Sequence, residues 1–232
     1  MPTVILVRHG RSTSNTSGVL AGRTPGVKLD ETGLQQADAV AERLAALPLA
    51  AIVTSPLDRC KQTAAAIAGH HGALRPATDK RLTECGYGDW TGQLLSKLMK
   101  DPLWPVVQQH PSAVTFPNGE SMRGMQQRAV DAVRAHDAAL TASHGAEAVW
   151  VAVTHGDVIK AIVADALGLH LDTFQRIVVD TASATVITYT PTRPFVVRVN
   201  DTGSELASLA PAPKGRRRKS AVRSSDAVVG GR

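Results

Sequence analysis

The stretch Val4-Ile5-Leu6-Val7-Arg8-His9-Gly10 joins four apolar residues to a guanidinium, an imidazole and a glycine. Four consecutive apolar residues that include Val and Ile predict a buried strand. Glycine adopts backbone angles that are closed to other residues, so we expect a sharp turn at Gly10. Arg8 and His9 should therefore lie at the carboxyl end of a strand, where α/β sheets bind their ligands.

A second segment far along the chain repeats this pattern. Residues 149–153 are apolar, and Thr154, His155 and Gly156 follow them. If the two strands belong to one sheet, the edge at which they end brings the two imidazoles together.

Helical and strand patterns alternate along the rest of the chain. Apolar residues recur at helical spacing over residues 34–47, and Pro48 ends that helix. Residues 50–53 predict a second buried strand, after which Ser55 is placed to cap a helix that has Pro56 at its first position and continues to residue 69. Helices are also expected at 122–140 and 158–167, and paired strands at 184–189 and 195–199. This order predicts an α/β fold with a mostly parallel sheet and helices on both faces.

Composition fits a globular protein. The chain has 232 residues, of which 43% are hydrophobic, and no apolar run approaches the length of a membrane span. We see no secretory signal pattern at the N-terminus. Cys60 and Cys85 form neither a zinc spacing nor a plausible disulfide framework, so we expect a cytoplasmic protein that does not bind membranes.

The basic character of the chain is confined to its end. Residues 211–232 hold seven basic residues and one acidic residue, which accounts for the whole formal net charge of +6. From residue 201 onward there is little to bury, so we expect a catalytic domain over 1–200 and a flexible tail over 201–232. The tail has no aromatic residues for base stacking, which favours a solvated terminus over a nucleic-acid or membrane-binding segment.

The paired histidines suggest phosphate chemistry. Arg59 falls in the first turn of a predicted helix, where free N–H groups already favour an anion. Together with Arg8 it would hold the oxygens of a phosphoryl group, and no metal-ligand cluster or P-loop competes with this interpretation. A neutral imidazole can attack phosphorus, and neighbouring arginines help to keep it neutral. The leaving alkoxide then needs a proton, for which Glu84 is the best local donor.

The block Arg8-His9-Gly10-Arg11-Ser12-Thr13-Ser14-Asn15 resembles the signature of the histidine phosphatase superfamily, also called phosphoglycerate mutase-like. Further blocks follow in the family's order, at residues 29–36, 55–63, 82–84 with Gly88 and Gly92, 118–121 and 154–156. The resemblance implies a three-layer α/β/α sandwich and no cofactor. It also implies that His9 is the nucleophile, that Glu84 is the proton donor, and that the phosphoryl group is bound by Arg8, Arg59 and His155 with help from Asn15.

Two features separate the branches of the family. Its cofactor-dependent mutases have an Arg-His-Tyr-Gly element after the acidic residue and paired arginines in a long cap, whereas this chain has Cys85-Gly86-Tyr87-Gly88 and a cap-like insertion at 93–120. Between residues 93 and 116 the only basic residues are Lys97 and Lys100. The resemblance therefore favours a broad or acid phosphatase-like enzyme whose substrate has an apolar or weakly polar group.

Several alternatives stay open. Mutase-type phosphoryl transfer uses the same pocket, and a non-catalytic family member would bind a phosphorylated ligand without turning it over. We expect a small phosphorylated metabolite as the partner, while nucleic-acid binding is disfavoured and a homodimer is possible. The family usually has Glu or Gln where this chain has Arg11, which either points inward toward a second anionic group or lies on the surface.

Overall fold

The central sheet has six strands in the order β3-β2-β4-β1-β5-β6 in the computed structural model, which describes residues 2–203. Strands β1 to β4 pair in parallel, β5 runs antiparallel to β1, and β6 runs antiparallel to β5. The predicted mostly parallel sheet and the terminal strand pair are therefore confirmed. The strands are β1 (Thr3–Arg8), β2 (Leu49–Thr54), β3 (Ala77–Thr78), β4 (Val149–Thr154), β5 (Ala184–Tyr189) and β6 (Pro194–Asp201).

Helices connect the strands in the predicted order. The α-helices are α1 (Thr13–Ser17), α2 (Glu31–Leu44), α3 (Asp58–Gly69), α4 (Leu95–Leu98), α5 (Trp104–Gln109), α6 (Met122–His144) and α7 (Gly156–Ala166). Short 3₁₀ turns are η1 (Lys80–Leu82), η2 (Gly88–Trp90), η3 (Pro111–Ala113) and η4 (Leu171–Arg176).

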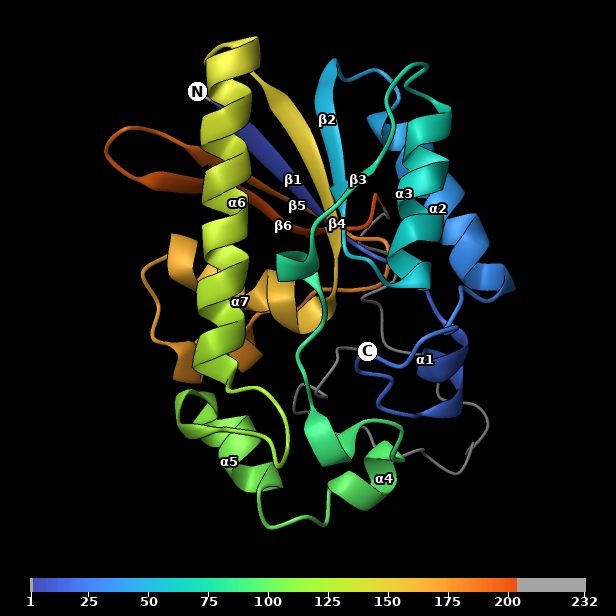
Figure 1. The fold of residues 1–232 in the computed structure, drawn as a ribbon, viewed down its shortest axis with the longest axis vertical. Helices are drawn as coiled ribbons and strands as arrows, with labels where there is room; N and C mark the ends of the chain where they lie inside the picture. The colour runs from blue at the N-terminus through green and yellow to red at the C-terminus, as the bar shows by residue number, and fades with distance from the viewer. Residues whose placement is uncertain (1, 204–232) are drawn as a thin grey trace, which may run out of the picture.

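The central strands bury side chains on both faces of the sheet, and this creates two cores. In β1, Val4 and Leu6 pack with α6 and α7, whereas Ile5 and Val7 pack with α2 and α3. This division follows from the alternation of side chains along a strand. The two helix pairs lie on opposite sides of the sheet (Figure 1), which confirms the three-layer α/β/α sandwich.

Two helix starts differ from the sequence prediction. Helix α2 begins at Glu31 rather than near residue 34, because the Asp30 carboxylate accepts a hydrogen bond from the Gly33 N–H at 2.8 Å and caps the first turn. Helix α3 begins at Asp58, and its N-cap position is Leu57. The predicted capping role of Ser55 is therefore wrong, although Arg59 does lie in the first turn of α3 as expected.

The segment over 93–120 packs its apolar residues onto the core. Leu98 and Val107 are buried, and the Trp104 ring stacks on Trp90 with 6.0 Å between centroids. These contacts fix part of the segment on the core, and its cap-like role stays a prediction. Leu94 and Met99 are exposed.

Gly10 is required for a different reason from the one expected. It is not among the residues with positive φ. A Cβ atom at Gly10 would instead overlap the backbone carbonyl of Gly33, so the loop after β1 needs glycine for its close approach to α2.

Two sequence expectations meet the limits of the described chain. Asp201 is the last residue of β6, and the rest of the predicted tail, from residue 204 onward, lies outside the described residues. Within residues 2–203, we find no helix with the length and apolar character needed to cross a membrane.

Candidate active site

The two His-Gly segments meet at one edge of the sheet. Strands β1 and β4 are parallel neighbours with Arg8 opposite Thr154, so His9 and His155 leave the sheet side by side. The His9 N–H donates to the Thr154 carbonyl at 3.0 Å, and the two imidazole centroids are 5.2 Å apart with planes at 67°. The predicted convergence of the two histidines is confirmed.

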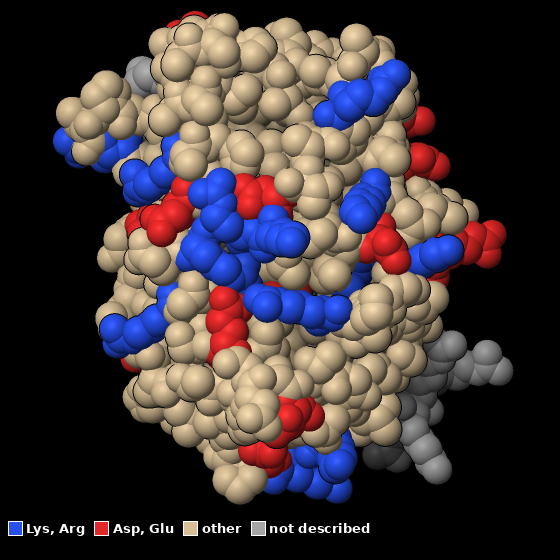
Figure 2. Space-filling view, in the orientation of Figure 1, with Lys and Arg blue, Asp and Glu red and all other residues tan. Residues whose placement is uncertain are grey.

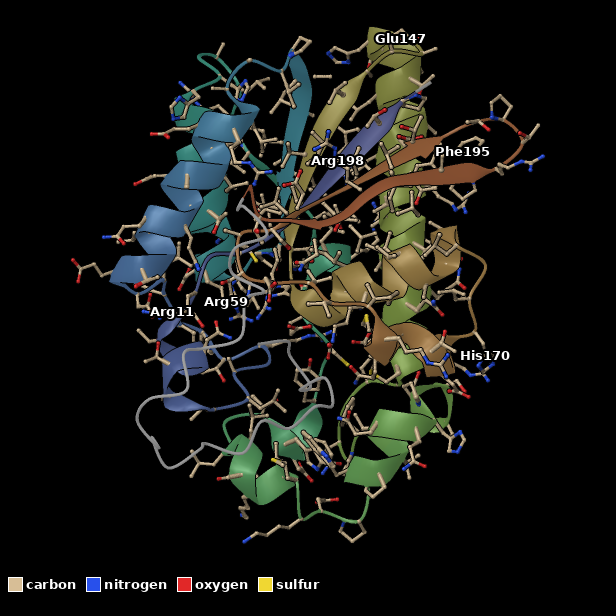
Figure 3. The ribbon with its side chains drawn as sticks, turned by 180° about the vertical axis from the view of Figure 1, so that it is seen from behind. Arg11, Arg59, Glu147, His170, Phe195 and Arg198 are labelled. Carbon is tan, nitrogen blue, oxygen red and sulfur yellow. The ribbon has the colours of Figure 1, made fainter. Side chains whose placement is uncertain are left out.

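Arg59 joins this pair from the start of α3. Its Nε donates to His9 Nε2 at 3.2 Å, and its Nη2 donates to the Gly22 carbonyl at 2.8 Å and lies 3.3 Å from His155 Nδ1. Figure 3 shows Arg59 where the strands end, between the sheet and the part of the chain that includes α4 and α5. Its Nη1 is buried and forms no hydrogen bond within residues 2–203. A buried guanidinium edge of this kind suits an oxyanion.

His9 is held as a neutral imidazole with a defined tautomer. Its Nδ1 lies 2.7 Å from the Gly10 carbonyl oxygen, which can only accept, so Nδ1 bears the proton and Nε2 has the lone pair. Burial, reinforced by the charges of Arg59 and Arg8, lowers the pKa of His9 well below its usual value. The ring therefore presents a nucleophilic nitrogen beside Arg59.

His155 is neutral for the same reasons. Burial and the charge of Arg59 lower its pKa well below the usual value. Its Nε2 lies 2.8 Å from Ser55 Oγ, a hydroxyl that can accept from this ring or donate to it. Ser55 thus allows either tautomer of His155 without moving a heavy atom. The sequence analysis missed this role because Ser55 precedes a proline near a helix start and matches a cap pattern.

Glu84 is buried beside His155. Its Oε2 lies 3.7 Å from His155 Nδ1, and its Oε1 accepts from the Cys85 N–H at 2.9 Å. Burial, followed by the nearby charge of Asp157, raises the pKa of Glu84 to about 7. A carboxyl group with this pKa can give up a proton and take it back near neutral pH.

Arg8 is the last residue of β1 and directly precedes His9. It is fully buried, its Nη1 donates to the Val179 carbonyl at 2.7 Å, and burial lowers its pKa. The charges of Glu84 and Asp157 oppose that shift. Asp157 in turn accepts a hydrogen bond from the Tyr87 hydroxyl at 2.7 Å. Neither Asp157 nor Tyr87 was predicted, although Asp157 is only two residues beyond His155.

Together these residues form a site with two buried guanidiniums, two neutral imidazoles and one carboxyl group. The sequence model of one protein family matches residues 4–202 of the chain. The chain is a member of branch 1 of the histidine phosphatase superfamily. Within residues 2–203, no group of three or more His, Cys, Asp or Glu residues is arranged to hold a metal ion.

Other family members show how far the likeness extends. Phosphoserine phosphatase 1 of Hydrogenobacter thermophilus is 31% identical over 87% of this chain and 93% of its own length. The structure of YhfR from Bacillus stearothermophilus has 31% identity and a TM-score of 0.78, over 87% of this chain and 98% of that one. A shorter match, 47% identical over 81 residues, covers 35% of this chain but only 39% of an uncharacterized Mycobacterium tuberculosis protein. Similar proteins include some named as phosphatases and some named as phosphoglycerate mutases.

Two further positions of the family signature have their side-chain partners outside this group of residues. Asn15 Oδ1 accepts from the Ser12 N–H at 2.9 Å and from Ser12 Oγ at 2.7 Å, which closes the first turn of α1. Asn15 forms no hydrogen bond with the other five predicted residues within the described chain, so its phosphate contact stays a prediction. Arg11 pairs with Asp30 at 2.7 Å, and its side chain is 42% exposed. Arg11 therefore takes the surface position rather than the inward one.

Proposed function

We propose that this protein is a metal-independent phosphomonoesterase that works through a phosphohistidine at His9. One observation supports it most directly: the neutral His9 presents an Nε2 lone pair next to the buried Arg59 guanidinium, whose Nη1 has no acceptor within the described residues. A phosphoryl group placed there meets a nucleophile and a buried cationic donor together.

In the first step His9 Nε2 attacks phosphorus in line with the leaving oxygen. An N–P bond forms and the P–O bond to the substrate alcohol breaks. Arg8, Arg59 and His155 bind the phosphoryl oxygens as their charge redistributes. The Glu84 carboxyl group donates its proton to the departing oxygen, so the product leaves as an alcohol.

In the second step water occupies the place of the alcohol. Glu84, now a carboxylate, takes a proton from that water while the water oxygen attacks phosphorus. The P–N bond breaks and returns the electron pair to His9 Nε2, inorganic phosphate leaves, and Glu84 is again protonated. A pKa of about 7 allows one carboxyl group to serve in both steps near neutral pH.

Hydrolysis is favoured over mutase chemistry by the charges around the site. Within 93–116 the only basic residues are Lys97 and Lys100, and both are exposed. A bisphosphate cofactor needs several fixed cations to hold its second phosphate. A relative that shares 31% identity over 87% of this chain is named as a phosphatase, whereas another with 31% identity over 68% of this chain is named as phosphoglycerate mutase-like.

The test is turnover of p-nitrophenyl phosphate in EDTA by the purified full chain and by His9→Ala. We expect hydrolysis by the former and a loss of at least about 10³-fold in the latter, since the nucleophile is gone. The phosphoryl label on His9 should be lost in acid and kept after an alkaline quench, because phosphohistidine hydrolyses in acid. Equal rates for the two proteins would refute the proposal, binding of phosphate without turnover would indicate a sensor, and transfer that requires 2,3-bisphosphoglycerate would indicate a mutase.

A further inference from the structure

A buried hydrogen bond between Tyr87 and Asp157 joins the proton-donor segment to helix α7. The Tyr87 hydroxyl donates to Asp157 Oδ2 at 2.7 Å, and both side chains are buried. Tyr87 is three residues beyond Glu84, and Asp157 is two residues beyond His155. Because Glu84 Oε2 also lies 3.7 Å from His155 Nδ1, the two segments are in contact at two places. The second contact limits how far the Glu84 carboxyl group can turn away from His155.

Asp157 also brings a buried negative charge to this part of the site. Its side chain has no solvent exposure, and Lys160 Nζ of the same helix lies 3.8 Å from Asp157 Oδ1. Lys160 donates to Gln175 Oε1 at 3.2 Å and lies over the Phe174 ring at 5.6 Å from its centroid. The Tyr87 hydroxyl and the Lys160 ammonium both stabilise Asp157 as a carboxylate.

Several parts of the fold place ionisable groups around the Glu84 segment. They are Arg8 of β1, Arg23 of the loop after α1, Arg59 and Cys60 of α3, Glu120 of the loop before α6, Arg128 of α6, His155 after β4, Asp157 and Lys160 of α7, and Cys85 and Tyr87 of the segment itself. The two thiols, the phenol and the imidazole are neutral near pH 7, because burial raises the pKa of the former three and lowers that of His155.

Asp157 and Glu120 are the negative charges in this set. Glu120 pairs with Arg23 at 2.8 Å and with Arg128 at 2.6 Å, so two guanidiniums already offset it. Burial is the first cause of the raised pKa of Glu84, and the charge of Asp157 is the second. Asp157 is thus the side chain that most favours the protonated form of Glu84.

Charges on the surface are screened from the site, whereas the charge of Asp157 is not. Figure 2 shows Lys and Arg side chains gathered with acidic ones at mid-height of the face crossed by α6, so opposite charges are mixed there. Exposed ion pairs of this kind are weakened by water and salt. A fully buried carboxylate such as Asp157 is screened much less.

We infer that Asp157 is a positioning residue for the proton donor: it holds the Glu84 segment on α7 through Tyr87, and its negative charge opposes ionisation of Glu84. This inference rests on the proposed phosphatase reaction, in which Glu84 must be protonated when the leaving oxygen departs. The consequence is that the acid step extends to higher pH than it would beside a neutral side chain.

The first test removes the charge and keeps the hydrogen bond. Asp157→Asn retains an oxygen that accepts from the Tyr87 hydroxyl. The alkaline limb of kcat/KM for glycerol 3-phosphate should move down by about one pH unit, because Glu84 then ionises more readily. At pH 8 this lowers kcat/KM about tenfold relative to the full chain, and at pH 5.5 the change should be less than about threefold. On p-nitrophenyl phosphate, whose leaving group needs no proton, the change should stay below about threefold at both pH values.

Asp165→Asn is the matched control, because it removes the same charge from the same helix. Asp165 pairs with Arg134 at 3.3 Å, and its side chain is 33% exposed. Solvent screens this charge, so the alkaline limb should stay within about 0.2 pH unit of that of the full chain. A limb that stays in place in Asp157→Asn, or that moves equally in both variants, contradicts the inference.

The second test removes the hydrogen bond and keeps the aromatic ring. The Tyr87 ring packs edge-on against Phe116 with 5.1 Å between centroids, so Tyr87→Phe keeps this packing. It should lower kcat/KM for glycerol 3-phosphate about 3- to 10-fold at pH 6, and that for p-nitrophenyl phosphate less than about twofold. Equal losses on the two esters show a general structural effect and contradict the positioning role. If Asp157→Asn does not fold, this comparison decides the inference.

A full chain that hydrolyses neither ester contradicts the proposed function instead, and the inference is then tested without turnover. In protein labelled with ¹³C at the glutamate carboxyl groups, the resonance that is missing from Glu84→Gln reports the titration of Glu84. Its midpoint should fall by about one pH unit in Asp157→Asn and stay in place in Asp165→Asn. An unchanged midpoint in Asp157→Asn contradicts the inference.

Discussion

The pKa of Glu84 gives the proposed mechanism a measurable pH dependence. This pKa is raised to about 7, so the carboxyl group is protonated below that pH and loses its proton above it. For an alkyl phosphate, whose leaving oxygen needs the proton, kcat should fall about tenfold per pH unit above 7. His9 has a pKa well below its usual value, so the nucleophile stays neutral through the same range.

Glu84→Gln removes the proposed proton donor and leaves the other site residues in place. On glycerol 3-phosphate it should lower kcat by about 10²- to 10⁴-fold and flatten the alkaline limb. On p-nitrophenyl phosphate, whose leaving group is stable as an anion, the loss in kcat/KM should be much smaller than on glycerol 3-phosphate, because kcat/KM reports the first step and not the hydrolysis of phosphohistidine, in which Glu84 activates water. Rate profiles from pH 5 to 9 with both substrates measure this, and an unchanged alkaline limb in the variant would assign the limb to another group.

At the residue scale, the sequence predicted the five residues that the structure brings together in the candidate site but not the residues that form hydrogen bonds around them. Arg8 ends β1, His9 and His155 follow β1 and β4, and Arg59 lies in the first turn of α3, so the convergence of these four was foreseeable from topology. Glu84 lies in a loop between η1 and η2, where topology gives no such indication. Ser55 and Asp157 act through contacts with side chains about 100 and 70 positions away, namely His155 and Tyr87. The residues that flank Ser55 and Asp157 in the sequence do not indicate these long-range contacts.

At the element scale, a close contact between two loops holds the Glu84 segment in place. Gly88 has φ of +52°, and a Cβ atom there would overlap the Pro117 carbonyl and lie 2.6 Å from the Gly119 nitrogen. Residues 86–88 and 117–120 therefore fit together only without a side chain at this position. The same two loops supply Gly86 and Glu120 to the surroundings of Arg23.

Gly88→Ala should accordingly destabilise the fold by more than backbone strain alone. We expect a loss of about 2–4 kcal/mol in the free energy of unfolding, from left-handed strain and steric overlap together. Gly18→Ala is the matched control, since Gly18 has φ of +67° but nothing within 4 Å of its Cβ position. It should cost only about 1 kcal/mol. Urea unfolding of both variants measures the difference, and equal losses would show that the loop contact is not tight.

Element types were more predictable than element ends. The burial of β1 and β4 follows from uninterrupted apolar runs, whereas α3 begins at Asp58 without a side-chain cap, and the Ser55 hydroxyl lies 2.8 Å from His155 Nε2. Helix α1 was not expected at all, because its capping box uses Ser12 and Asn15 in a segment rich in Ser and Thr that matches a loop pattern. Such short helices depend on one or two side-chain hydrogen bonds rather than on an apolar face.

At the scale of the whole molecule, the candidate site residues and the excess of positive charge lie in different parts of the sequence. Every predicted site residue lies within residues 8–155, and the hydrogen-bond partners described for the site lie within residues 2–203. The excess of positive charge lies in residues 211–232, so residues 1–210 are formally neutral. The basic isoelectric point of the chain therefore says little about its catalytic site.

Deleting residues 211–232 tests whether the basic segment contributes to function. We expect kcat/KM for p-nitrophenyl phosphate to stay within about twofold at 0.15 M salt, where charges more than about 8 Å apart are largely screened. If residues 211–232 are only a solvated terminus, retention on heparin at the same salt should also be unchanged. A fall in kcat/KM would place part of the segment at the site. A loss of heparin binding with full activity would instead identify residues 211–232 as a polyanion-binding segment that is independent of the phosphatase reaction.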